Sequence, residues 1–219
     1  KMNTFFLFCS VVVIICVELC LADCDNLQDY CPTDTGSLHA VFINGFPCKN
    51  PAGITASDFK SSMLNHPGDT DNFYRSSTNV VTAAEFPGLN TLGLAIARTD
   101  LDVDGIVMPH SHPRASEVLF VSKGVVITGF IDTKNQLFQS TLNEGDLFVF
   151  PRGLLHFCLN AGYEAATVFS VLNSQNPGLV RIADAMFDPD HSTLDKIVRK
   201  IKSVSGREGD QVGTCETKE

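Results

Sequence analysis

The chain has 219 residues, 44% of them apolar, and a formal net charge of -9. This length suffices to bury one substantial hydrophobic core, so we expect one main folded domain. The excess of acidic residues repels nucleic-acid phosphates and anionic lipid head groups, and no cluster of lysine or arginine offsets it, so we predict no nucleic-acid partner.

The first 22 residues have the pattern of a secretory signal peptide. An apolar run from Phe5 to Val17 is followed by the small-residue cleavage signal Cys20-Leu21-Ala22, directly before Asp23. A retained membrane anchor is the alternative, but Glu18 leaves the apolar run shorter than the ~20 residues that a spanning helix needs. We predict cleavage after residue 22, a secreted chain and no membrane span in the mature protein.

Five cysteines follow the predicted cleavage point: Cys24, Cys31, Cys48, Cys158 and Cys215. Secretion permits disulfides, but five is an odd number and the sequence alone does not give the pairing. Cys158 lies in an apolar, strand-like run, where we expect a buried free thiol.

The predicted elements change character along the chain. Residues 23–75 are rich in Asp, Asn, Gly and Pro, with one strand-like run at 40–44, and we predict an irregular N-terminal arm. Short β-type runs then follow at 80–82, 92–98, 118–121, 125–131, 137–142, 147–150, 155–159 and 165–172. Many short strands separated by turn clusters predict an antiparallel sandwich or a closed barrel, which we place at residues 76–175.

The hydrophobic period becomes helical after Pro177. Residues 179–187 form a short helical candidate, and Ser192-Thr-Leu-Asp195 resembles a capping box that opens a second helix. The apolar stripe of that helix comprises Leu194, Ile197, Val198, Ile201 and Val204. The stripe needs a packing surface, either its own barrel or a neighbouring subunit. We predict C-terminal α-helices over 176–206 and a polar tail over 207–219.

Three histidines and a glutamate have the spacing of a metal site. His110 and His112 are two residues apart, so an extended backbone, which the flanking prolines favour, presents both imidazoles on one face. Glu117 adds an oxygen ligand, and His156 comes from an apolar run bounded by turn residues. Three imidazoles and one carboxylate suit a transition metal. The alternative is a set of core histidines hydrogen-bonded to the backbone.

These stretches resemble a known family. They read H-x-H-x4-E-x6-G and G-x5-P-x-G-x2-H-x3-N, which are similar to the two motifs of the cupin superfamily. The first departs at one place, because the glycine expected six residues before His110 falls on Asp104. The amino-acid sequence is further similar to those of plant germins and germin-like proteins in four segments, residues 27–31, 44–48, 112–117 and 173–178.

The resemblance implies an all-β cupin jelly-roll barrel with manganese held by His110, His112, Glu117 and His156. It further implies a Cys31–Cys48 disulfide in the arm, and a homohexamer built as a trimer of dimers through the C-terminal helices. It places the protein outside the cell, in the apoplast or cell wall, where cell-wall components are candidate partners. Arg114, inside the first motif, is expected in a surface or interface ion pair.

Two activities recur in this family, namely manganese-dependent oxalate oxidation and superoxide dismutation. The oxidases place two asparagines near the metal, and the matching residues here are Ala97 and Val107, whose side chains cannot hydrogen-bond a carboxylate. We therefore disfavour oxalate oxidation and take superoxide dismutation, with a role in defence or development, as the leading enzymatic hypothesis. A non-enzymatic structural, storage or receptor-like cupin is the alternative.

Overall fold

The computed structural model describes residues 31–34, 45–181, 199 and 203. These form two compact units, one within residues 1–61 and 83–93 and the other within 62–82 and 94–219. The predicted signal peptide, the run at 40–44, nearly all of the C-terminal helices and tail, and Cys24 and Cys215 lie outside the described residues. Among the residues described, no helix is long and apolar enough to cross a bilayer.

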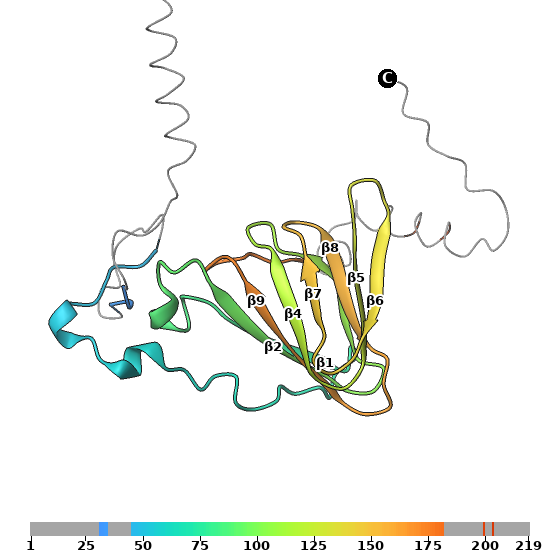
Figure 1. The fold of residues 1–219 in the computed structure, drawn as a ribbon, viewed down its shortest axis with the longest axis horizontal. Helices are drawn as coiled ribbons and strands as arrows, with labels where there is room; N and C mark the ends of the chain where they lie inside the picture. The colour runs from blue at the N-terminus through green and yellow to red at the C-terminus, as the bar shows by residue number, and fades with distance from the viewer. Residues whose placement is uncertain (1–30, 35–44, 182–198, 200–202, 204–219) are drawn as a thin grey trace, which may run out of the picture. The chain divides into compact units, whose positions relative to one another are not determined.

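The second unit consists of two five-stranded antiparallel sheets (Figure 1). The strands are β1 Ser76–Val81, β2 Ala95–Leu101, β3 Ile106–Ser111, β4 Glu117–Lys123, β5 Val126–Ile131, β6 Leu137–Leu142, β7 Leu147–Phe150, β8 Leu155–Asn160, β9 Ala166–Leu172 and β10 Val180–Arg181. One sheet has the order β1-β2-β9-β4-β7 and the other β10-β3-β8-β5-β6, so strands distant in sequence are neighbours in both. The predicted all-β jelly roll is confirmed.

The hydrophobic core lies between the two sheets. Inward residues alternate with outward ones along β4, where Leu119 and Val121 are buried while Val118 and Phe120 are exposed. The buried cluster contains Leu101, Leu119, Val121, Val126, Leu142, Phe150, Cys158, Ala166 and Val168. Burying a large apolar side chain contributes about 1.5–3 kcal/mol, so this cluster supplies much of the stability of the barrel.

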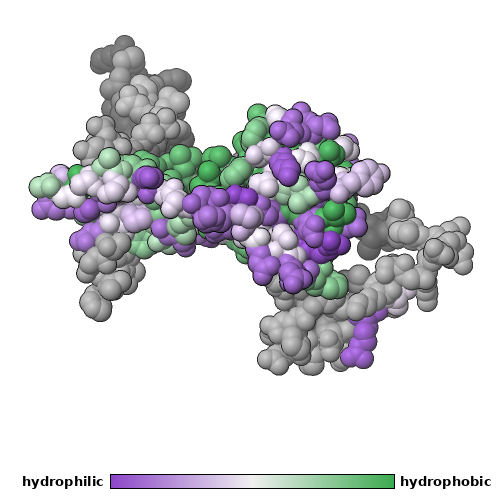
Figure 2. All heavy atoms as spheres, turned by 90° about the horizontal axis from the view of Figure 1, so that it is seen from below, coloured by the Kyte–Doolittle hydropathy of each residue, from purple (hydrophilic) through white to green (hydrophobic). Residues whose placement is uncertain are grey.

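An apolar outer face covers three neighbouring strands of the first sheet. Val118 is paired across the strands with Val149 and Val171, while Phe120 is paired with Leu147 and Phe169. These six side chains form two rows of three. Five of them are 40% to 63% exposed. We call them the outer apolar face. Figure 2 shows that apolar residues reach the surface elsewhere too, among hydrophilic ones.

A polar cluster surrounds Asp100 on β2. Its two carboxylate oxygens accept hydrogen bonds from Nε and Nη2 of Arg98, both at 2.9 Å at closest. They also accept from the Gly68 amide at 2.9 Å and from the Thr167 hydroxyl at 3.0 Å. Asp100 is 6% exposed, and this ring of donors fully compensates the burial of its charge.

The first unit has little regular structure within its described residues. It contains three short 3-10 helices, η1 Pro51–Gly53, η2 Ala56–Phe59 and η3 Pro87–Leu89. The Cys31–Cys48 disulfide, expected from the family resemblance, is present. Buried Asn90 donates to the carbonyls of Cys31 and Phe46 and accepts from the Phe46 amide. The chain-entropy account assigns a loop closure of this length about 3 kcal/mol.

Candidate metal centre

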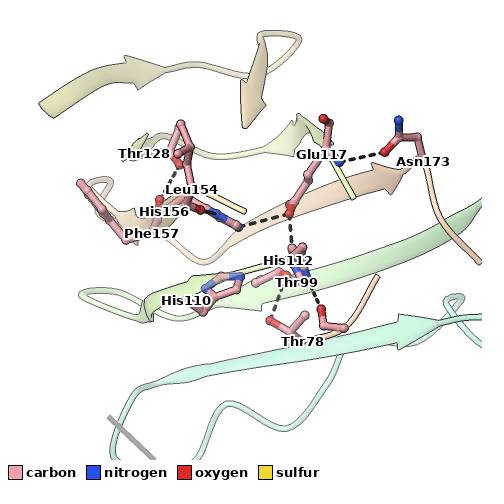
Figure 3. Close-up of polar contacts among 12 residues, drawn as sticks. Thr78, Thr99, His110, His112, Glu117, Thr128, Leu154, His156, Phe157 and Asn173 are labelled. Atoms are coloured by element: carbon pink, nitrogen blue, oxygen red, sulfur yellow. Dashed lines mark hydrogen bonds and ion pairs between the residues drawn. The ribbon is translucent and has the colours of Figure 1, made fainter. Parts of the chain in front are cut away.

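Three strands and one connecting segment bring the four predicted ligands together. His110 lies on β3, His112 directly after it, Glu117 opens β4 and His156 lies on β8, where it is paired with His110. A register irregularity between Val107 and His110 interrupts the pairing of β3, and such bulges re-aim side chains. The ligand atoms of the four residues all lie within 4.8 Å of one another (Figure 3).

Glu117 stands between two of the imidazoles. Its Oε2 atom is 3.3 Å from Nε2 of His112 and 3.3 Å from Nε2 of His156. These two contacts lack the geometry of hydrogen bonds. The buried atoms Glu117 Oε2 and His156 Nε2 therefore have no hydrogen-bond partner among the described residues. A buried polar atom without a partner costs about 1–3 kcal/mol. A cation between these atoms would remove that cost.

Backbone carbonyls orient all three imidazoles. The Nδ1 atoms of His110, His112 and His156 lie 2.9, 2.6 and 2.8 Å from the carbonyl oxygens of Met108, Gly178 and Leu154. A carbonyl only accepts, so each Nδ1 carries the proton and each Nε2 presents a lone pair. This arrangement is the usual support of metal-bound histidine. The histidines therefore do hydrogen-bond the backbone, but with one nitrogen only, and their other nitrogens converge.

The electrostatics of the metal-free site follow from burial and from Glu117. Burial, with the neighbouring His156, lowers the pKa of His110 to about 4. Burial also opposes protonation of His112, but the neighbouring Glu117 carboxylate and the hydrogen bond to the Gly178 carbonyl outweigh it and raise the pKa of His112. Against the effect of burial, His112 and His156 hold the pKa of Glu117 far below its ordinary value, so Glu117 is an anion. A metal cation meets one negative charge and three neutral donors.

A cavity of about 210 Å³ adjoins the four residues. Its lining includes Thr78, Val80, Ala97, Thr99, Val107, Met108 and Leu179. Ala97 and Val107 thus face the space beside the donor set, where their side chains offer no hydrogen bond. The hydroxyls of Thr78 and Thr99 are 3.0 Å apart and bond to each other.

Further contacts of the site were not predicted from sequence. The Phe150 ring stacks on the His156 ring at 4.4 Å between centroids, and the Ser170 hydroxyl hydrogen-bonds Glu117. Cys158 is a free, buried thiol, as predicted, and burial raises its pKa to about 12, which keeps it protonated. His66, which lacks neighbouring ligands in the sequence, is exposed.

Several known proteins are similar to this chain in sequence and in architecture. The family model described as Cupin matches residues 62–205. A germin-like protein 11-1 of Oryza sativa subsp. japonica is 57% identical over 84% of this chain and 82% of its own length. A germin-like protein subfamily 3 member 4 of Arabidopsis thaliana is 54% identical over 91% of this chain and 95% of its own.

Among solved structures, a recombinant oxalate oxidase in complex with glycolate superposes with a TM-score of 0.74. It is 36% identical and covers 81% of this chain and 92% of its own. The chain belongs to the cupin family and, within it, to the plant germin-like proteins.

Proposed function

We propose that this protein binds one manganese ion through His110, His112, Glu117 and His156 and dismutates superoxide. The observation that carries the proposal is the convergence of three Nε2 atoms and one carboxylate oxygen, two of them buried without a hydrogen-bond partner. A mixed nitrogen and oxygen donor set admits manganese, and the family resemblance favours it over other transition metals. Manganese, when bound, supplies one-electron redox chemistry.

The residues of the chain hold and shield the site. The carbonyl-bound Nδ1 atoms fix the imidazoles, Glu117 supplies the negative charge, and Phe150 packs against His156 on the apolar side. A metal held by these four ligands would adjoin the cavity, through which a small anion could reach it. The net reaction converts two superoxide anions and two protons into dioxygen and hydrogen peroxide, one superoxide being oxidised and the other reduced.

Oxalate is not the proposed substrate, despite the similarity to an oxalate oxidase that binds glycolate. The second carboxylate of oxalate would need polar partners in the cavity, and both Ala97 and Val107 line it with hydrocarbon. Transfer of a carboxylate to such a surface without hydrogen bonds is unfavourable.

We further propose that the protein is secreted, resides in the apoplast or cell wall and associates as a homohexamer. The Cys31–Cys48 disulfide supports an oxidising location, since such bonds are rare in reducing compartments. The outer apolar face supports association, because exposed apolar patches of this kind mark contact surfaces. Cell-wall components are the candidate partners.

The test is metal analysis of the purified secreted protein, with superoxide and oxalate assays on the same preparation and His112→Ala as the control. We expect near-stoichiometric manganese and dismutation in the native protein, and neither in the variant. Manganese without either activity would replace the enzymatic proposal by a structural or receptor-like role. Oxalate turnover would show that Ala97 and Val107 do not exclude that substrate.

A further inference from the structure

The loop of residues 173–178, between β9 and β10, lies against the segment that carries His112 and Glu117. Asn173 and Ser116 exchange two hydrogen bonds, at 2.8 Å from the Ser116 amide to the Asn173 side chain and at 3.2 Å from the Asn173 amide to the Ser116 carbonyl. The Arg114 amide donates to the Pro177 carbonyl at 3.1 Å. Two segments far apart in sequence are therefore joined beside the donor set.

Arg114 makes the side-chain contacts of this junction. Its Nε donates to the Asn176 carbonyl at 2.7 Å and its Nη2 to the Asn176 side-chain oxygen at 2.8 Å. The guanidinium also lies directly against Gly178, because a Cβ at that position would be 2.9 Å from Nη2. Gly178 has φ +71°, so glycine is favoured there on both counts. The expected ion pair of Arg114 does not occur within the described ranges, and its partner is a neutral amide.

His112 depends on this loop in a way that the other two histidines do not. The acceptors for His110 and His156 lie two residues before each histidine, Met108 within β3 and Leu154 immediately before β8. The acceptor for His112 is the carbonyl of Gly178, 66 residues away. The local course of the backbone fixes the first two acceptors, whereas the third must be held in place by contacts between segments.

We propose that Arg114 is a positioning residue for the metal centre. By fixing Asn176 and packing against Gly178, it holds the Gly178 carbonyl on Nδ1 of His112 and so sets the direction of the His112 lone pair. This inference rests on the proposed metal binding at the four-residue site. Loss of such outer support typically lowers metal affinity 10–100-fold. By linkage, metal binding should in turn stabilise the 173–178 loop.

The experiment measures Mn²⁺ affinity by chelator competition for the native chain, Arg114→Ala, Arg114→Lys and Asn176→Ala. We expect Arg114→Ala to weaken binding about tenfold or more, and the other two to lie between it and the native chain, because each keeps part of the junction. Arg75→Ala is the matched control. It removes a side-chain pair of similar length, 2.7 Å from Nη2 to Asp102 Oδ2, that does not contact the 173–178 loop.

A second readout follows the loop itself. Hydrogen exchange of residues 173–181 should slow when Mn²⁺ is added to the native chain and should be faster in Arg114→Ala with or without metal. Unchanged Mn²⁺ affinity in Arg114→Ala, or equal weakening in Arg75→Ala, would overturn the proposal. If Arg114→Ala does not fold, Arg114→Lys and Asn176→Ala decide the question.

These experiments distinguish a failure of the proposed metal binding from a failure of the proposed role of Arg114. A native chain that binds no transition metal contradicts the proposed function. The positioning role is then decided in the metal-free protein, where ¹⁵N imidazole spectra should show a protected Nδ1–H of His112 that Arg114→Ala loses. Retention of that signal in the variant would contradict the role of Arg114.

Discussion

Asp100 and Glu117 are two carboxylates with nearly equal burial, 6% and 7% exposed, in the same barrel. Asp100 is surrounded by donors from Arg98, Gly68 and Thr167, and both of its oxygens are satisfied. Glu117 faces imidazoles that approach to 3.3 Å, and its Oε2 has no hydrogen-bond partner in the described part of the chain. The two carboxylates therefore do not differ in burial. They differ in whether all of their oxygens have hydrogen-bond partners.

The pKa values of the two carboxylates are also shifted in the same direction. Burial opposes ionisation at both positions. The Arg98 hydrogen bonds nevertheless hold the pKa of Asp100 below its ordinary value, and the imidazoles do the same for Glu117. Both are anions at neutral pH. The difference is that Asp100 is neutralised by a cation of the chain, while we propose that Glu117 is neutralised by a bound metal.

The largest expected effect comes from Glu117→Gln. Removing the only anionic ligand should lower Mn²⁺ affinity by more than about 100-fold, beyond the range typical of outer support. Chelator competition tests this. Native-like metal affinity in Glu117→Gln would remove Glu117 from the ligand set.

Asp100→Asn should give the converse result. Leaving Arg98 without its carboxylate should destabilise the barrel by about 2 kcal/mol, the scale of a lost hydrogen bond to a charged group, because both side chains keep some exposure. Metal affinity at the four-residue site should not change. Urea unfolding with and without Mn²⁺ measures both quantities, and a weakened Mn²⁺ affinity at unchanged stability would contradict the distinction drawn between the two carboxylates.

Acid should also act on the two sites differently. Glu117 and the Gly178 carbonyl raise the pKa of His112 above its ordinary 6.5, so on acidification it takes up a proton that a metal would have to displace. Apparent Mn²⁺ affinity should therefore fall as the pH is lowered through the folded pKa of His112, by about tenfold per pH unit for one displaced proton. Titrations at about pH 8 and about pH 6 test this. An affinity independent of pH in this range would contradict it.

The metal-free chain should lose stability over a lower range. The pKa of His110 is about 4 when folded and near 6.5 when unfolded, so the unfolded state binds more protons between these values. Stability should fall as the pH drops from about 6.5 toward about 4. The contribution of Asp100 should hold through this range and disappear only below its ordinary pKa of 3.8, as pH falls through the lowered folded value. Unfolding of His110→Ala, which should lack the upper phase, provides the control.

The smallest effect is expected at Arg75 and Asp102. This pair is as short as 2.7 Å, but its side chains are 48% and 41% exposed. Arg75→Ala should leave the unfolding free energy close to that of the native chain, because solvent screens exposed pairs. A loss as large as that of Asp100→Asn would contradict the importance of burial in this comparison.

Much of the site could be predicted because its signals are local. His110, His112, Glu117 and His156 are set by spacing along extended segments, and β6 and β7 have the predicted bounds. β3 was predicted only as an extended stretch around the histidines, since its proline and irregular pairing break the alternation of a regular strand. The motif position where Asp104 replaces the expected glycine has φ +59°, so the backbone keeps the glycine-like conformation.

The unpredicted features depend on contacts between distant segments. Nothing local to Arg114 indicates that its partner is Asn176, and nothing local to His112 identifies the Gly178 carbonyl as its acceptor. The sequence of residues 173–178 contributed to the family resemblance. Its physical role depends on β9 and β10, which place the loop beside the four predicted ligands.

The carbonyl acceptors of the three imidazoles also bear on how the site tolerates sequence change. Met108, Leu154 and Gly178 contribute main-chain oxygens, which every residue type possesses. A point mutation can displace such an acceptor but cannot delete it, unlike a carboxylate or amide in the same role. The orientation of the ligands is therefore inherited with the course of the backbone, and side chains around them can diverge while the capacity to bind a metal is kept.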